Sequence, residues 1–171
     1  MEINKFFKRF FKYELTTAIV CILIPFILII GQGEALESIS AYAYSSVDFI
    51  FCVLLTLGAT LITTIGIKKN QTITWILGLN LMLIPLTPHL AVPVIHLIVS
   101  IIFFGGMTIH IIKYSDRYRQ FRWFLVGIIA ASFGLYYFTD VISLFAVESI
   151  ALCLFGVNFL ADIIADRKEF R

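Results

Sequence analysis

Six apolar stretches separated by short polar connections dominate this chain and decide what it can fold into. They cover residues 15–31, 47–67, 73–87, 93–112, 121–138 and 141–163. A helix that crosses a bilayer needs about 20 such residues, and the third stretch is the shortest. None alternates apolar and polar residues as a barrel strand does, and only a helix satisfies its own backbone in hydrocarbon. The sequence therefore predicts an all-α transmembrane bundle of six spans, forming one domain over residues 1–171.

The composition excludes a water-soluble fold. Of the 171 residues, 60% are hydrophobic, and the mean hydropathy is +0.98, so too little polar surface is left to face water. The sequence contains no nucleotide-binding loop and no soluble domain to hold one. ATP-driven chemistry is therefore excluded.

All thirteen lysines and arginines would share one side of the membrane if each stretch crosses it. They are Lys5, Lys8, Arg9, Lys12, Lys68, Lys69, Lys113, Arg117, Arg119, Arg122, Arg167, Lys168 and Arg171. Because basic residues mark the cytoplasmic side, we expect a multi-pass protein of the cell (inner) membrane with both termini cytoplasmic. Basic side chains at helix ends face lipid head groups, so the net charge of +2 indicates membrane lipids as partners and no nucleic acid. Assembly into a homo-oligomer stays open.

Three ionisable residues lie in the outer parts of different stretches, opposite the basic side. Asp48 opens the second stretch, His96 lies one turn into the fourth, and Glu148 lies about two turns into the sixth. Such groups are costly at membrane depth without a partner or a task, so we predict that the three form one site. Three protein ligands and a water make an open zinc site, which makes these residues the candidate catalytic and metal-binding set and zinc the candidate cofactor. The adjoining connections add Glu34, Glu37, His89 and Asp140.

Each candidate also has a structural explanation. Ser45 and Asp48 have the spacing of a capping box, in which both side chains satisfy free amides of a first helical turn. A histidine on an apolar face, such as His96, is more often packed and hydrogen-bonded than bound to a metal. Glu148 is too deep for a helix cap, so its structural explanation is the weakest. His110, at the basic side, is interpreted as an interfacial residue.

The connection over residues 32–46 is the longest outside the membrane, and it contains no lysine, arginine or proline. We expect it to pack over the outer mouth of the bundle. Tyr42 and Tyr44 would anchor it in the membrane interface.

Small residues in the stretch 121–138 form two overlapping pairs, Gly127 with Ala131 and Ala130 with Gly134. Pairs at this spacing let the backbone of a neighbouring helix approach closely.

Three segments resemble a group of small bacterial integral membrane proteins of unknown function. They are SISAYAYSSVDFIF at residues 38–51, IHLIVSIIFF at 95–104 and VESIALCLFGVNFL at 147–160. More distantly, the chain is similar to the alkaline ceramidase and adiponectin receptor superfamily, whose resemblance implies an intramembrane zinc hydrolase of lipid amides. Asp48 and either Ser40 or Ser45 would match its early motif. The superfamily has seven spans and a histidine pair in the last, whereas the last stretch here contains no histidine.

Three classes of function follow, and whether the chain is an enzyme stays open. We favour a non-enzymatic membrane protein, such as a sensor, an assembly factor or a structural protein. One alternative is a metal-dependent hydrolase that acts on a lipid or amide at the outer leaflet. Another is a small proton-coupled carrier in which Glu148 and His96 form a relay.

Overall fold

The computed structural model describes the backbone of residues 2–114, 118–139 and 141–169, and the side chains of 11–114, 118–139 and 141–165. The helices are α1 (Glu2–Gln32), the 3-10 helix η1 (Ile39–Tyr44), α2 (Asp48–Lys68), α3 (Thr72–Leu86), α4 (Pro93–Lys113), α5 (Arg119–Phe138) and α6 (Leu144–Glu169). Within these ranges the chain forms no strand, so the prediction of an all-α fold is confirmed.

Five helices are long and apolar enough to cross a membrane, which indicates a membrane protein. Their spans are Phe11–Gln32, Asp48–Lys68, Pro93–Lys113, Arg119–Phe138 and Leu144–Ala165. The remaining predicted span, the third stretch over residues 73–87, corresponds to α3, which is apolar but only 15 residues long. It ends at Leu86 because Thr87 precedes Pro88, and a residue before proline is disfavoured in the helical conformation.

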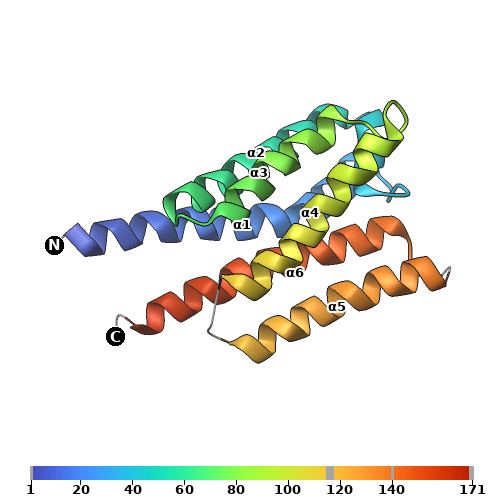
Figure 1. Cartoon of the computed structure of the whole chain (residues 1–171). Coiled ribbons are helices and arrows are strands. Elements are labelled where there is room, and N and C mark those ends of the chain that lie inside the picture. The colour runs from blue at the N-terminus through green and yellow to red at the C-terminus, as the bar shows by residue number, and fades with distance from the viewer. Residues whose placement is uncertain (1, 115–117, 140, 170–171) are drawn as a thin grey trace.

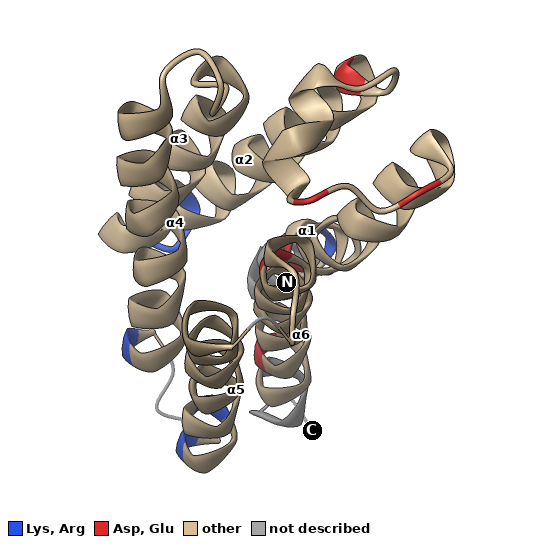
Figure 2. Cartoon of the chain, turned by 90° about the vertical axis from the view of Figure 1, so that its right-hand side faces the viewer, with Lys and Arg blue, Asp and Glu red and all other residues tan. Residues whose placement is uncertain are grey.

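The helices lie side by side in a bundle with two chemically different ends (Figure 1). The start of α1, the α2–α3 connection, the end of α4, the start of α5 and the end of α6 share one end, which we call the basic end. The connection of residues 33–47 lies at the opposite, acidic end, with the α3–α4 connection, the end of α5 and the start of α6. Figure 2, viewed from the acidic end, shows acidic residues on the near connections. The acidic residues described at the acidic end are Glu34, Glu37, Asp48 and Glu148.

Close helix packing depends on glycines that the sequence pattern did not single out. A Cβ at Gly78 of α3 would lie 2.1 Å from Thr63 Oγ1 of α2. A Cβ at Gly156 of α6 would lie 2.8 Å from the carbonyl oxygen of Ala18 in α1. These two glycines therefore let α2 approach α3 and α1 approach α6.

The small residues of α5 do not have this role within the chain, and that prediction is wrong. Apart from the adjoining backbone of α5 itself, no atom of the described residues lies within 4 Å of a Cβ built at Gly127 or Gly134. Ala130 and Ala131 are exposed. These residues lie on the outer surface of the bundle because α5 turns Arg122, Leu125 and Ile129 inward instead.

The 33–47 connection packs against the bundle, as expected for this segment. Ser38 caps η1 by accepting a hydrogen bond from the backbone N–H of Ala41 at 3.1 Å, and Ile39 and Ser40 are buried. Tyr42 is completely buried, so its predicted place in the membrane interface is wrong. Its hydroxyl donates to the carbonyl oxygen of Glu34 at 3.0 Å, and burial raises the pKa of Tyr42.

Candidate functional site

A cavity of about 630 Å³ lies at the acidic end among α4, α5, α6 and the 33–47 connection. Its polar wall includes Glu37, Ser38, Ser40, His96, Ser100 and Glu148. Its apolar and aromatic wall includes Leu97, Ile101 and Phe104 of α4 and Phe133, Tyr136 and Tyr137 of α5. The cavity thus joins a polar pocket under the connection to an apolar surface between two helices that are long and apolar enough to cross a membrane.

Glu148 fastens the 33–47 connection to α6. It lies one turn into the helix, because Ser143 caps α6 and the helix begins later than the apolar stretch. Its side chain is 7% exposed, and its Oε2 accepts a 2.6 Å hydrogen bond from the backbone N–H of Ile39. That N–H belongs to the first turn of η1, where helical amides lack a partner within the helix. A second bond, from Phe145 N–H to the Glu37 carbonyl at 2.9 Å, reinforces the link.

His96 is held in one tautomer by the α3–α4 connection. Its Nδ1 lies 2.7 Å from the carbonyl oxygen of Thr87. A carbonyl can only accept, so Nδ1 carries the proton, and Nε2 of the neutral ring is an acceptor. His96 is 8% exposed, and its ring lies 5.8 Å from that of His89, which also lines the cavity.

The structure brings His96 and Glu148 to one cavity but places Asp48 elsewhere. Asp48 is exposed at the start of α2, where its Oδ1 accepts from the backbone N–H of Phe49 at 2.6 Å. Ser45 Oγ accepts from the N–H of Val47 at 3.2 Å, so both side chains satisfy backbone amides at this helix start. Of the predicted neighbours, Glu37 and His89 line the cavity, Glu34 does not, and Asp140 lies outside the described residues.

The residues present do not fit the zinc site in its three-ligand form. Across the described residues, no group of three His, Cys, Asp or Glu side chains is placed to hold a metal ion. The reason is topological, because Asp48 starts α2 whereas the cavity lies among α4, α5 and α6.

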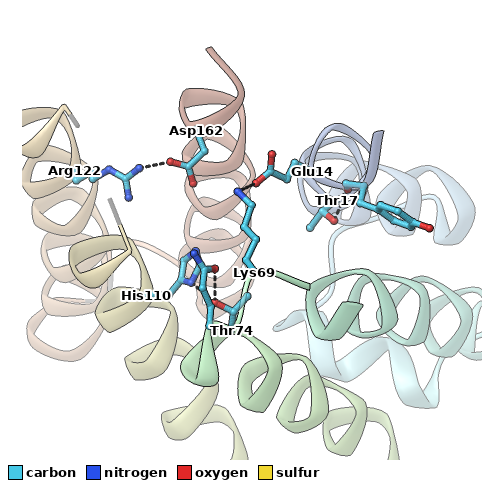
Figure 3. Close-up of polar contacts among 9 residues, drawn as sticks. Glu14, Thr17, Lys69, Thr74, His110, Arg122 and Asp162 are labelled. Carbon is cyan, nitrogen blue, oxygen red and sulfur yellow. Dashed lines mark hydrogen bonds and ion pairs between the residues drawn. The ribbon is translucent and has the colours of Figure 1, made fainter. Parts of the chain in front are cut away.

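Two ion pairs at the basic end were missed by the sequence interpretation (Figure 3). Lys69 pairs with Glu14 of α1, and Arg122 of α5 pairs with Asp162 of α6. The Glu14 and Arg122 side chains are each only 3% exposed. Arg122 Nη1 also donates to the carbonyl oxygen of Ile111 in α4 at 3.0 Å. Two residues interpreted only as markers of topology therefore join helices as well.

His110 belongs to the same end and is not interfacial, which corrects its interpretation. It is 2% exposed, and its ring centroid lies 5.3 Å from that of Phe155 in α6. Its Nδ1 lies 2.8 Å from Thr74 Oγ1, which itself donates to Gln71 Oε1 at 3.1 Å. The hydroxyl has one proton, so it must accept from His110, and Nδ1 carries the proton.

One feature of the sequence could have revealed the ion pairs at the basic end. Glu14 and Asp162 are acids at the edges of apolar stretches on the side that carries the lysines and arginines. An acid at such a depth calls for a basic partner from another helix. The sequence does not show which helix supplies that partner.

The model of a family of unknown function, DUF7103, matches residues 23–163. The matched region contains the whole cavity, His110 and the pair of Arg122 with Asp162. No curated protein matches, and neither does any solved structure. These comparisons give no support to a relation with the alkaline ceramidase and adiponectin receptor superfamily, or to a bacterial source.

Proposed function

The chain belongs to this family of unknown function, which brings no activity with it, and from the site itself we propose a non-enzymatic, multi-pass membrane protein that binds an amphipathic molecule. The observation that carries the proposal is the cavity at the acidic end, with a polar pocket at one side and an apolar wall at the other. Its volume of about 630 Å³ lies in the range of ligand-binding cavities. A sensor or a lipid-binding assembly factor would use such a site.

The proposed orientation places the cavity in the outer leaflet of the cell (inner) membrane. It includes α3 as a sixth span, with both termini in the cytoplasm. The lysines and arginines support it, because described ones such as Lys68, Lys113 and Arg119 lie at the basic end. At 15 residues α3 is about 22 Å long, less than the hydrocarbon core, and its neighbours α2 and α4 would complete the crossing around it.

The apolar wall supports entry from the lipid. Leu97 and Ile101 of α4 are 53% and 61% exposed, and both line the cavity. In a bilayer these side chains would face hydrocarbon, so an acyl or alkyl chain could enter between α4 and α5.

The 33–47 connection supports a covered polar pocket. Besides the links to α6, the connection has one to the α3–α4 connection. The hydroxyl oxygen of Tyr44 accepts hydrogen bonds from the backbone N–H groups of Leu90 and Ala91, at 2.9 and 3.2 Å. The connection is therefore fastened to the α3–α4 connection as well as to α6. A head group below it would be shielded from bulk water.

Photo-crosslinking tests this proposal. A neutral long-chain alcohol with a diazirine in its alkyl chain is added to the full-length protein in nanodiscs, and labelled residues are identified by mass spectrometry. We expect saturable labelling at Phe104 and Phe133, which the unlabelled alcohol removes. Ser100→Phe, which fills the cavity, should abolish that labelling but not labelling at Ile102, which is exposed outside the cavity. Labelling that is non-saturable and unchanged in Ser100→Phe would overturn the proposal.

A hydrolase is the second candidate, and one observation favours it. Ser40, His96, Ser100 and Glu148 all line a narrow recess of about 20 Å³ beside the cavity. A histidine with a free Nε2 acceptor is suited to take a proton from a hydroxyl or a bound water.

Zinc content separates the metal-dependent form of that candidate from the binding protein. The purified protein is compared with Asp48→Asn, His96→Ala and Glu148→Gln. Stoichiometric zinc that all three variants lose would support the shared three-residue site. Zinc lost in His96→Ala and Glu148→Gln but kept in Asp48→Asn would agree with the placement of these residues.

A further inference from the structure

We infer that the molecule bound in this cavity has a cationic head group, such as a protonated amine, and carries no phosphate or carboxylate. This inference rests on the proposed function and names the chemistry of its ligand. Three features of the cavity support it: the charges that line it, the hydrogen-bonding roles of its polar groups, and the position of its aromatic rings.

The charged residues that line the cavity are acidic. Glu37 and Glu148 line it, and no lysine or arginine of the described residues does. The three connections at this end, residues 33–47, 87–92 and 139–143, also contain no lysine or arginine in the sequence. An anionic head group would therefore meet like charge without a basic partner, whereas a cation would meet opposite charge in a site of low dielectric.

The buried Glu148 and His96 of the polar pocket offer acceptors. Glu148 uses Oε2 for Ile39, and a carboxylate has a second oxygen that only accepts. The fixed tautomer of His96 leaves Nε2 as a second acceptor. An ammonium has three N–H donors and no acceptor, so it matches these groups, while a carboxylate or phosphate needs donors.

Aromatic rings also line the cavity. Tyr136 and Tyr137 of α5 line the cavity, and their ring centroids are 5.3 Å apart. The face of a tyrosine ring attracts an organic cation. Phe104 and Phe133 also line the cavity, form an edge contact with ring centroids 5.5 Å apart, and would contact an alkyl chain.

The test compares three probes of equal chain length, namely octylamine, octan-1-ol and octanoate. Each is titrated into the full-length protein in nanodiscs of zwitterionic lipid, and binding is measured by calorimetry and by the shift in unfolding temperature. Glu148→Gln removes the carboxyl group that a bound ammonium would keep ionised, but keeps an oxygen that can accept from Ile39. Asp48→Asn is the matched control, because it removes an acid at the same end that does not line the cavity.

We expect octylamine to bind most tightly and octanoate most weakly. Glu148→Gln should weaken octylamine about tenfold, as expected for a charge-assisted contact, and leave octan-1-ol within about twofold. Asp48→Asn should change neither value by more than about twofold.

Two results would overturn the inference, and they are distinguishable. If all three probes bind with equal affinity and Glu148→Gln has no effect, the cavity binds amphiphiles without charge selection, and the proposed function stands alone. If no probe gives saturable binding, and the neutral diazirine alcohol also fails to label Phe104 and Phe133, the proposed function fails as well.

Discussion

Thr74 fixes the protonation of a buried histidine through one hydroxyl group. It accepts from His110 Nδ1 and donates to Gln71, and it is completely buried. Thr74→Val keeps the shape of the side chain but leaves Nδ1 of His110 without its acceptor. An unsatisfied buried donor costs about 1–2 kcal/mol, so we expect that loss in the free energy of unfolding, measured by denaturant titration in mixed micelles.

Thr74→Ser is the control for this prediction, because it removes a methyl group and keeps the hydroxyl. It should lose less stability than Thr74→Val. Equal losses in the two variants would mean that packing, and not the hydrogen bond to His110, accounts for the role of Thr74.

The ion pair of Arg122 with Asp162 should be worth more than a surface pair. The two side chains are 3% and 18% exposed, and Arg122 also bonds to the Ile111 carbonyl. Arg122→Met removes the pair at a site with little water, so we expect a loss of about 3 kcal/mol in the free energy of unfolding. The double variant Arg122→Met with Asp162→Leu should recover part of it. Arg119→Met, which removes an exposed arginine of the same helical turn, should be nearly neutral.

The sequence correctly identified His96 and Glu148 as groups that face the interior of the bundle. It could not show which residues they contact. Both are polar residues within apolar stretches. Such side chains face the interior of a bundle because exposing them to hydrocarbon costs free energy. Asp48 lies at the first residue of its helix, where a carboxylate can satisfy backbone amides instead. Position along the helix therefore separated these cases, whereas the side of the membrane predicted for all three did not.

At the scale of the helices, backbone contact at Gly78 should matter more than the small-residue pattern of α5. A Cβ at Gly78 would lie 2.5 Å from the backbone N of Thr63 and 2.7 Å from the carbonyl oxygen of Ala59. Gly78→Ala must push α3 away from α2, so we expect a loss of about 1–3 kcal/mol in the free energy of unfolding.

Gly127→Ala is the matched control, because the same methyl group meets open space on α5. It should be neutral or stabilise the protein by up to about 1 kcal/mol, since alanine favours the helix. A large loss on Gly127→Ala would show that this face of α5 is covered by another molecule. A neutral Gly78→Ala would contradict the close contact of α2 with α3.

Helix positions were predictable because hydropathy alone marks a segment that must bury its backbone in lipid. The ends of the helices were less so, because they depend on local capping. The helix α6 begins at Leu144, three residues after the start of the apolar stretch 141–163. It begins there because Ser143 caps it, with the Ser143 Oγ accepting from the backbone N–H of Ala146 at 3.2 Å. Which helices are neighbours was not predictable, because the glycine contacts that pair them carry no periodic pattern in the sequence.

At the scale of the whole molecule, the distribution of charge between the two ends bears on the side from which a ligand would reach the cavity. The basic end has its ion pairs inside the bundle, and the acidic end has a cavity without a basic side chain among its described lining residues. If the positive-inside rule orients the chain, the cavity faces the outer leaflet, and a cationic amphiphile would reach it from that leaflet. The orientation therefore determines from which side a ligand would arrive.

Cysteine labelling measures that orientation directly. The native Cys21, Cys52 and Cys153 are first replaced by alanine, and single cysteines are placed at Glu37, exposed at the acidic end, or at Thr72, exposed at the basic end. In intact cells a membrane-impermeant maleimide should label Glu37→Cys and leave Thr72→Cys unmodified, because the proposed orientation places the basic end in the cytoplasm. Permeabilised cells should label both, which shows that both positions are reactive.

Labelling of Thr72→Cys but not of Glu37→Cys in intact cells would reverse the orientation and move the cavity to the inner leaflet. Labelling of both positions in intact cells would mean that both lie outside, so that α2 between them does not cross the membrane, and the six-span topology would have to be abandoned.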